Sequence, residues 1–148
     1  MTLELGAGPY EACQQISPRH EDYAILPIED AFDWSSLSFC DFEQLYLVVF
    51  RSLRRPEVDL DLLLEHDDRA YEAAMAAGGL LRYFKGDANE RGDCLSFCLW
   101  ETGEQARKAA ASAAHKSAAS ITAQTYLSYV LERYQLKKHG SDLIFERI

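Results

Sequence analysis

The sequence of 148 residues lacks long hydrophobic runs. No stretch approaches the roughly 20 consecutive apolar residues that a membrane-spanning helix needs, so we expect no contact with a membrane. The first 30 residues are acidic and contain three of the four prolines, unlike the basic start and apolar middle of a signal peptide. We therefore expect a cytoplasmic protein, and a nuclear location stays open.

Basic residues are scarce, with 15 Lys and Arg against 24 Asp and Glu and a formal net charge of −9. A nucleic-acid partner requires cations that neutralise its phosphates, so we expect no nucleic acid to bind. The one basic cluster, Arg51, Arg54 and Arg55, lies at the end of a predicted strand. This cluster could hold an anion, but three charges in such a place are more typical of a solvated rim.

The sequence also lacks paired cysteines, because its four Cys residues form no Cys-x-x-Cys motif. On one strand face Cys94 and Cys98 would lie roughly 13 Å apart, which is too far for a disulfide. No His or Cys stands nearby at the spacing of metal ligands. We interpret the thiols as buried hydrophobic groups and expect neither a metal nor a cofactor.

Hydrophobic residues make up 48% of the chain, which is enough for the core of one domain. Residues 1–42 show no sustained periodicity but carry four apolar anchors near their end: Phe32, Trp34, Leu37 and Phe39. An exposed apolar patch is costly, so we predict an arm that packs on the domain or on a partner subunit. Residues 43–148 form the predicted domain.

A strand and a helix open the predicted domain. Residues 45–53 are apolar on both alternating faces, with Leu45, Leu47 and Val49 on one and Tyr46, Val48 and Phe50 on the other. This pattern predicts a strand that is buried on both sides. Asp59 can cap a helix that runs to about Ala77, where two glycines end it.

A hairpin and a second helix complete the pattern. Residues 80–85 and 94–100 predict two antiparallel strands joined by a polar loop. Thr102 and Gln105 have the spacing of a capping box, so a helix should begin there. The helical pattern extends from residue 103 to residue 138 with a break expected around residues 116–120, and residues 143–148 predict a final strand.

The order strand, helix, strand, strand, helix, strand is the βαββαβ arrangement of a ferredoxin-like α+β fold. Its four-stranded antiparallel sheet would carry the helices on one face. The other face needs a cover too, and the economical cover is a second copy packed sheet to sheet. We therefore predict a homodimer, arranged as a dimeric α+β barrel.

Five segments carry a family resemblance: LYLVVFRS, LLRYFKGD, LSFCLWET, AAHKSAA and YLSYVLERYQL. Over residues 43–148 they resemble the dimeric α+β barrel superfamily, and most of all its antibiotic-biosynthesis-monooxygenase-like branch. In that branch a strand ending in Trp-Glu-Ser leads into a helix with a His, as Trp100 here leads towards His115. More narrowly, FRSLRRP, NERGDCLSFCLWE and YVLERYQL resemble a family of fungal proteins of unknown function.

The superfamily includes cofactor-free oxygenases of polyphenols, haem-degrading enzymes, decarboxylases, cyclases and proteins without known activity. Fold alone therefore does not fix a function. The resemblance implies a protein that binds a small molecule, with a cofactor-independent enzyme acting on an aromatic or polyketide-like substrate as its most specific form. Whether the chain is an enzyme, and on which substrate, stays open at this point.

His115 is the candidate catalytic residue, as general base or acid. It shares one face of the predicted helix with small residues, so its imidazole could reach a cavity there. Trp100 and Tyr126 would shape an apolar pocket for a small aromatic ligand, and Tyr46 or Tyr83 would hold a polar group of that ligand. The alternative for each of these residues is ordinary packing in the core or on a helix surface.

Two other functions stay open. The first is a non-catalytic interaction or structural dimer, in which Phe32 and Trp34 of the arm contact another protein. The second is haem binding, with His115 as the iron ligand. The haem-degrading relatives carry their catalytic Trp on the helix and an Asn in the first strand, whereas Trp100 ends a strand and the first strand here has no Asn.

Overall fold

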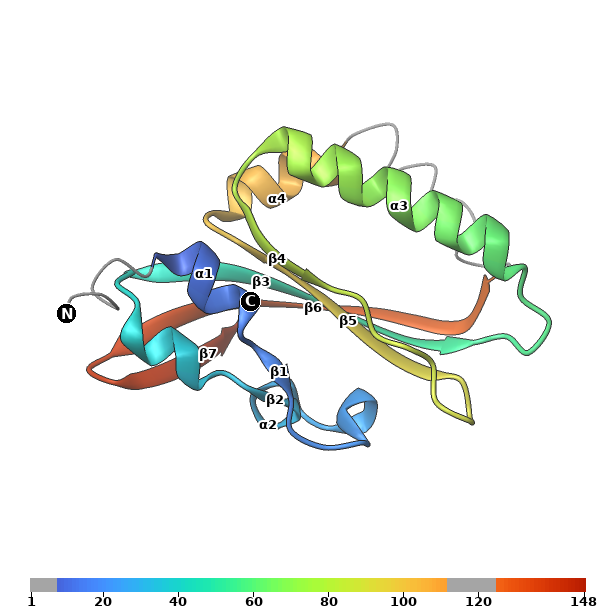
Figure 1. The fold of residues 1–148 in the computed structure, drawn as a ribbon, viewed down its shortest axis with the longest axis horizontal. Helices are drawn as coiled ribbons and strands as arrows, with labels where there is room; N and C mark the ends of the chain where they lie inside the picture. Colours follow the sequence, from blue (N-terminus) through green and yellow to red (C-terminus); the bar gives the residue numbers. More distant parts are fainter. Residues whose placement is uncertain (1–7, 112–124) are drawn as a thin grey trace.

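The computed structural model describes residues 8–111 and 125–148. Its main feature is a five-stranded antiparallel sheet in the order β4-β5-β3-β6-β7. The strands are β3 (Gln44–Arg54), β4 (Leu80–Phe84), β5 (Asp93–Trp100), β6 (Tyr126–His139) and β7 (Asp142–Arg147). Two helices, α3 (Leu60–Ala77) and α4 (Gly103–Ala110), cover one face, and the N-terminal segment covers the other (Figure 1).

The order β3-α3-β4-β5-α4-β6 confirms the predicted βαββαβ fold of the α+β class. Its four strands lie in the ferredoxin-like order, with β3 between β5 and β6. The predicted final strand is present as β7, but it is a fifth strand that pairs with the end of β6. The prediction of four strands is therefore corrected to five.

The prediction of a helix up to residue 138 is wrong, because Tyr126–His139 forms strand β6. This segment pairs with β3 from Gln44 to Arg54, so long-range hydrogen bonds replace the helical ones. Its tyrosines and Val130 favour a strand as much as a helix, and spacing alone could not separate the two. The predicted break around residues 116–120 lies outside the described residues.

Local signals predicted where both helices begin. The Asp59 side chain accepts a hydrogen bond from the Leu62 amide at 3.0 Å and caps α3, which ends at Ala77 before Gly78, as predicted. At α4 the Thr102 hydroxyl accepts from the Gln105 amide at 3.3 Å. The Gln105 side chain in turn accepts from the Thr102 amide at 3.2 Å, which completes the predicted capping box.

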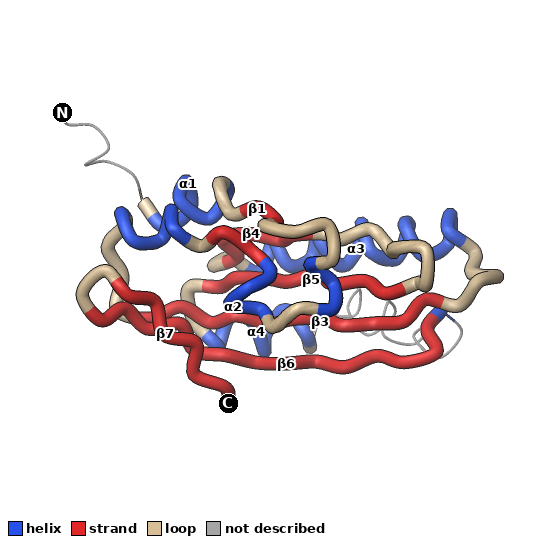
Figure 2. Tube along the Cα trace, turned by 90° about the horizontal axis from the view of Figure 1, so that it is seen from below, coloured by secondary structure: helices blue, strands red, loops and turns tan. Residues whose placement is uncertain are grey.

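The N-terminal segment consists of short elements that lie across the sheet (Figure 2). In order they are α1 (Pro9–Gln14), β1 (Ser17–Pro18), η2 (Tyr23–Ile25), α2 (Ile28–Ala31), β2 (Phe32–Asp33) and η3 (Ser35–Phe39). We call residues 8–42 the arm. Its apolar side chains and those of the strands form one core cluster in which Phe32, Ile28 and Leu37 are fully buried.

Phe32 is the centre of this cluster. Its ring lies 4.9 Å from Phe84 and 5.1 Å from Phe97, both on the sheet, in edge-to-face arrangements. The rings of Tyr23 and Trp34 pack on its other sides at 5.5 and 5.8 Å. Edge-to-face pairs are favourable beyond the burial of their area, so this contact binds the arm firmly to the sheet.

Three basic side chains of the sheet also hold the arm, by donating hydrogen bonds to its carbonyl oxygens. Arg51 donates to Leu26 at 2.8 Å and to Ala24 at 3.1 Å. Arg82 donates to Cys13 at 2.7 Å and to Ile16 at 3.1 Å, and Lys138 donates to Cys40 at 2.6 Å and to Ser38 at 3.2 Å. Arg51 is therefore an anchor for the arm and not part of a solvated rim.

The arm thus occupies the sheet face on which the sequence predicts a second copy. Three of its four predicted apolar anchors are buried in this contact: Phe32, Trp34 and Leu37. The fourth, Phe39, is 82% exposed. The predicted homodimer stays a prediction, but its original reason, an uncovered sheet face, does not apply to this conformation of the chain.

Replacement of Phe32 by alanine tests the contribution of the arm to stability. Because Phe32 is fully buried among four rings, Phe32→Ala should lower the free energy of unfolding by about 3–5 kcal/mol. Phe39→Ala removes the same side chain from an exposed position in the same arm and should change it by less than about 0.5 kcal/mol. Urea denaturation measures both variants, and equal effects would show that the arm does not pack as described.

Candidate functional site

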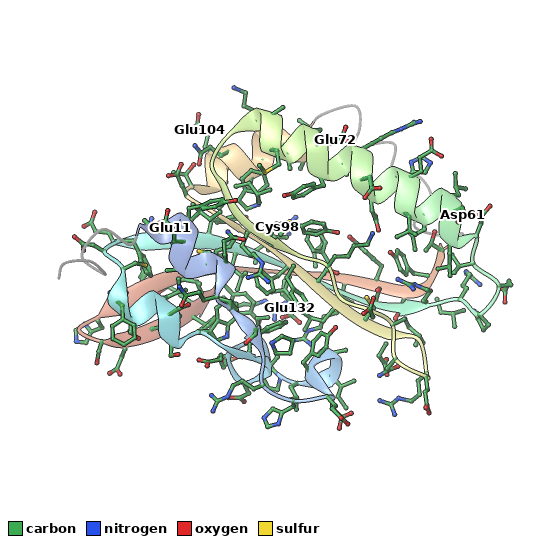
Figure 3. The ribbon with its side chains drawn as sticks, in the orientation of Figure 1. Glu11, Asp61, Glu72, Cys98, Glu104 and Glu132 are labelled. Atoms are coloured by element: carbon green, nitrogen blue, oxygen red, sulfur yellow. The ribbon has the colours of Figure 1, made fainter. Side chains whose placement is uncertain are left out.

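A cavity of about 130 Å³ lies between α3 and the sheet, on the face opposite the arm. The side chains around it come from β3, α3, β4, β5 and β6: Phe50, Ser52, Arg54, Asp67, Ala70, Tyr71, Ala74, Leu80, Tyr83, Lys85, Cys94, Ser96, Cys98, Tyr126 and Tyr129. Figure 3 shows Cys98 in the space between the sheet and α3. We call this space the α3 cavity.

Aromatic rings form two walls of the α3 cavity. Tyr83 of β4 stacks on Tyr71 of α3, with their centroids 5.5 Å apart and an interplanar angle of 29°. Tyr126 and Tyr129 of β6 lie 5.3 Å apart, and Tyr129 contacts Phe50 of β3 at 6.4 Å. The cavity is therefore bordered by flat apolar surfaces that also carry hydroxyl groups.

Three charged side chains line the same cavity. Arg54 comes from the end of β3, Asp67 from the middle of α3 and Lys85 from the residue after β4. The Lys85 Nζ lies 3.7 Å from the Asp67 Oδ2, and both side chains are partly shielded from solvent. Burial raises the pKa of Asp67 above its usual range, although Lys85 and Arg54 act in the opposite direction.

The phenols and thiols of the cavity are held in their neutral forms. Burial raises the pKa of Tyr126 to about 12, and burial together with the Asp67 charge raises the pKa of Tyr83 and Tyr129 further. Burial also raises the pKa of the Cys98 thiol to about 12. The tyrosines can therefore donate hydrogen bonds near neutral pH, whereas Cys98 is a poor nucleophile there.

The predicted site residues are divided between two adjoining cavities. Tyr83 and Tyr126 line the α3 cavity, whereas Tyr46 and Trp100 line a second cavity of about 120 Å³ beside α4. Phe50 and Cys98 line both and so separate them. Tyr46 and Trp100 are also buried, at 8% and 3% exposure, and pack in the helix-side core.

His115, the predicted catalytic residue, lies outside the described residues. Of the charged residues of the α3 cavity, the sequence drew attention only to Arg54, as part of the basic cluster that could hold an anion. Asp67 and Lys85 were not predicted, although Asp67 left a signal in the sequence. Leu63, Asp67, Ala70 and Ala74 are spaced three or four residues apart, so they share the helix face that meets the sheet. An acidic residue on an otherwise apolar helix face indicates a polar site between the helix and the sheet. Lys85 carries no comparable signal.

Three further observations concern metal ligands, cysteines and membrane-spanning helices. Within residues 8–111 and 125–148, no three or more His, Cys, Asp or Glu side chains are grouped so that they could hold a metal ion. The four cysteines are free and buried, as predicted. In the same parts of the chain, no helix is both long and apolar enough to span a membrane.

Comparison with protein families gives one match: the PB2B2.08-like family model matches residues 10–146. This match includes nearly all of the arm as well as the domain. Among curated proteins, none matches the chain at a significant level.

Solved structures of several organisms share the fold. A candidate antibiotic biosynthesis monooxygenase from Nitrosomonas europaea is 10% identical, with a TM-score of 0.54 over 66% of this chain and 93% of that one. Another from Caulobacter crescentus CB15 is 18% identical, with a TM-score of 0.53 over 62% and 89%. A conserved protein from Methanosarcina mazei Go1 is 12% identical, with a TM-score of 0.54 over 62% and 92%.

These comparisons confirm the resemblance to antibiotic-biosynthesis-monooxygenase-like proteins as a likeness of fold. The identities are too low to transfer an activity or a set of site residues. The structures match about nine-tenths of their own length but only about two-thirds of this chain, which is therefore longer than the shared fold.

The pH dependence of stability tests the environment of Asp67. The pKa of Asp67 is higher in the folded than in the unfolded chain. Its contribution to stability is therefore present below the ordinary Asp pKa of 3.8 and is lost as the pH rises through the folded pKa. At neutral pH the ionised carboxylate therefore destabilises the fold. Asp67→Asn should raise the free energy of unfolding at neutral pH, and this gain should shrink in acid.

The exposed Glu72 of the same helix provides the control for this measurement. Glu72→Gln should change the free energy of unfolding by less than about 0.5 kcal/mol at either pH. Urea denaturation at both pH values measures the two variants. A loss of stability in Asp67→Asn that does not depend on pH would contradict the environment described for this carboxylate.

Proposed function

The chain belongs to the PB2B2.08-like family, and on this premise we propose that it binds a small aromatic molecule in the α3 cavity. The observation that carries this proposal is the volume of the α3 cavity together with the kinds of side chain that line it. A cavity of about 150 Å³ with apolar walls can hold a benzene molecule. The α3 cavity, at about 130 Å³, has room for one ring between its two tyrosine pairs.

The polar groups around the cavity favour an aromatic ligand with a polar substituent over a purely apolar one. Ligand sites are typically apolar clefts with a few polar groups that fix orientation. Here the hydroxyls of Tyr83, Tyr126 and Tyr129 can donate hydrogen bonds, and the charged groups lie among them. The volume of about 130 Å³ favours a ligand with one ring over a large polyketide, which would have to extend out of the cavity.

An enzyme is the more specific form of this proposal: a cofactor-independent oxygenase, decarboxylase or cyclase acting on such an aromatic compound. Among the described residues, Asp67 is the group best suited to accept a proton, because its pKa is raised and it borders the cavity. His115 stays our proposed second base. Turnover of phenolic substrates that is unchanged in His115→Ala would remove it from this role.

The alternative of a non-catalytic interaction protein loses its original support. It requires Phe32 and Trp34 to contact another protein, yet they are 0% and 7% exposed and pack on the sheet of their own chain. The homodimer stays a prediction that requires a surface other than the one the arm covers. Haem binding by His115 also stays a prediction, and a hemin titration without a Soret band would exclude it.

Filling the α3 cavity tests the proposed function. Ala70 of α3 lines the cavity, so the larger side chain of Ala70→Leu should occupy the space of the ligand. We expect phenol to bind the wild-type protein, and we expect Ala70→Leu to weaken this binding at least about tenfold, because overpacking a filled site costs roughly 1–3 kcal/mol. Isothermal titration calorimetry measures both affinities.

The matched control is Ala76→Leu, which makes the same change at an exposed position of the same helix. This variant should bind phenol as the wild type does. Thermal denaturation of all three proteins shows whether the fold is retained. Absence of binding to the folded wild-type protein, or equal binding by Ala70→Leu, would overturn the proposed function.

A further inference from the structure

The three charged groups of the α3 cavity lie where chain segments distant in the sequence meet. Arg54 ends β3, Asp67 stands in α3 and Lys85 follows β4, yet all three line one cavity. Together they carry two positive charges and one negative charge. The site is thus locally positive in a protein whose formal net charge is −9.

The contact between Asp67 and Lys85 leaves Arg54 with a hydrogen-bond donor that is not used by any of the described residues. Asp67 is in contact with Lys85, at 3.7 Å. The Nε of Arg54 is buried and has no hydrogen-bond partner within the described part of the chain. A buried donor without a partner is costly, and a guanidinium group is well suited to bind a carboxylate. Asp67 balances only one of the two positive charges of Arg54 and Lys85. The other positive charge remains available to bind a negatively charged oxygen of a ligand.

The charged groups are also close enough to the rings to act on the same ligand. The Asp67 charge raises the pKa of Tyr83, Tyr126 and Tyr129, and the Arg54 charge lowers that of Tyr126. Such interactions between charges are strongest where little solvent lies between the groups. The aromatic rings and the charged groups line the same cavity, so they form one candidate binding site.

We infer that the ligand is an aromatic carboxylate, with its ring between the tyrosine pairs and its carboxylate at Arg54 and Lys85. This inference rests on the proposed function and adds the charge of the ligand to it. The single negative charge of such a ligand matches the excess positive charge of the site. The ring matches the enclosed volume of about 130 Å³. A dianion would leave one charge unmatched beside Asp67.

Three small probes separate the contributions of ring and charge. Benzoate carries both, benzamide has the same ring and shape without the charge, and acetate has the charge without the ring. Hydrogen bonds to charged groups contribute roughly 1.5–3 kcal/mol, so benzoate should bind at least about tenfold more tightly than benzamide. Acetate should bind much more weakly than benzoate. Isothermal titration calorimetry at low ionic strength measures all three.

Two variants test whether Lys85 and Arg54 cause the preference for benzoate over benzamide. Lys85→Met and Arg54→Lys should each weaken benzoate binding about tenfold. Both should weaken benzamide binding much less, since a neutral amide gains less from a cation than a carboxylate does. Arg54→Lys keeps the charge and so limits any damage to the fold. Arg69→Met removes an exposed charge on the outer side of α3, where Arg69 pairs with Glu65, and should bind benzoate as the wild type does.

The possible outcomes distinguish this inference from the proposed function. Equal affinities for benzoate and benzamide would overturn the inference and leave an aromatic site intact. Equal affinities for benzoate and acetate would overturn it by showing an anion site to which the ring contributes nothing. Failure of every aromatic probe, phenol included, to bind the folded protein would overturn the proposed function as well.

Discussion

The central strand β3 carries apolar side chains on both faces, and both faces must be shielded from water. Leu45, Leu47 and Val49 point towards the arm, whereas Tyr46, Val48 and Phe50 point towards the helices. One layer of helices cannot cover both faces of a sheet. The fold therefore depends on a second cover, and in this chain the arm provides it through Phe32 and the basic side chains that hold its carbonyl groups.

The two covers differ in the space that they leave beside the sheet. On the arm side, Phe32, Phe97 and Leu47 are fully excluded from solvent, and a wide open hollow of about 640 Å³ borders the arm at Leu26 and Pro27. On the helix side α3 leaves a ring-sized cavity, and charged groups line it. Placing Asp67 there lowers stability at neutral pH, a cost that is common where a fold maintains a binding site. In our proposal the arm therefore shields the sheet, whereas α3 borders the ligand.

Local signals predicted most of the fold. The two alternating faces of β3, the Asp59 cap and the Thr102 capping box depend on neighbouring residues, and the structure confirms each of them. Strand β6 was missed because its pairing with β3 is a long-range contact that residue spacing does not contain. Of the predicted site residues, Tyr83 and Tyr126 line the α3 cavity, and their role in binding stays a prediction. Arg54 and Lys85 reach the cavity only through the packing of distant segments.

The central claim is that the space between α3 and the sheet is a site for an aromatic anion. A crystal structure of the full chain with benzoate tests it most directly. We predict the ring between the Tyr71–Tyr83 and Tyr126–Tyr129 pairs, with the carboxylate at Arg54 and Lys85. Benzoate bound only elsewhere, or a cavity filled by side chains of the protein at saturating benzoate, would contradict this account.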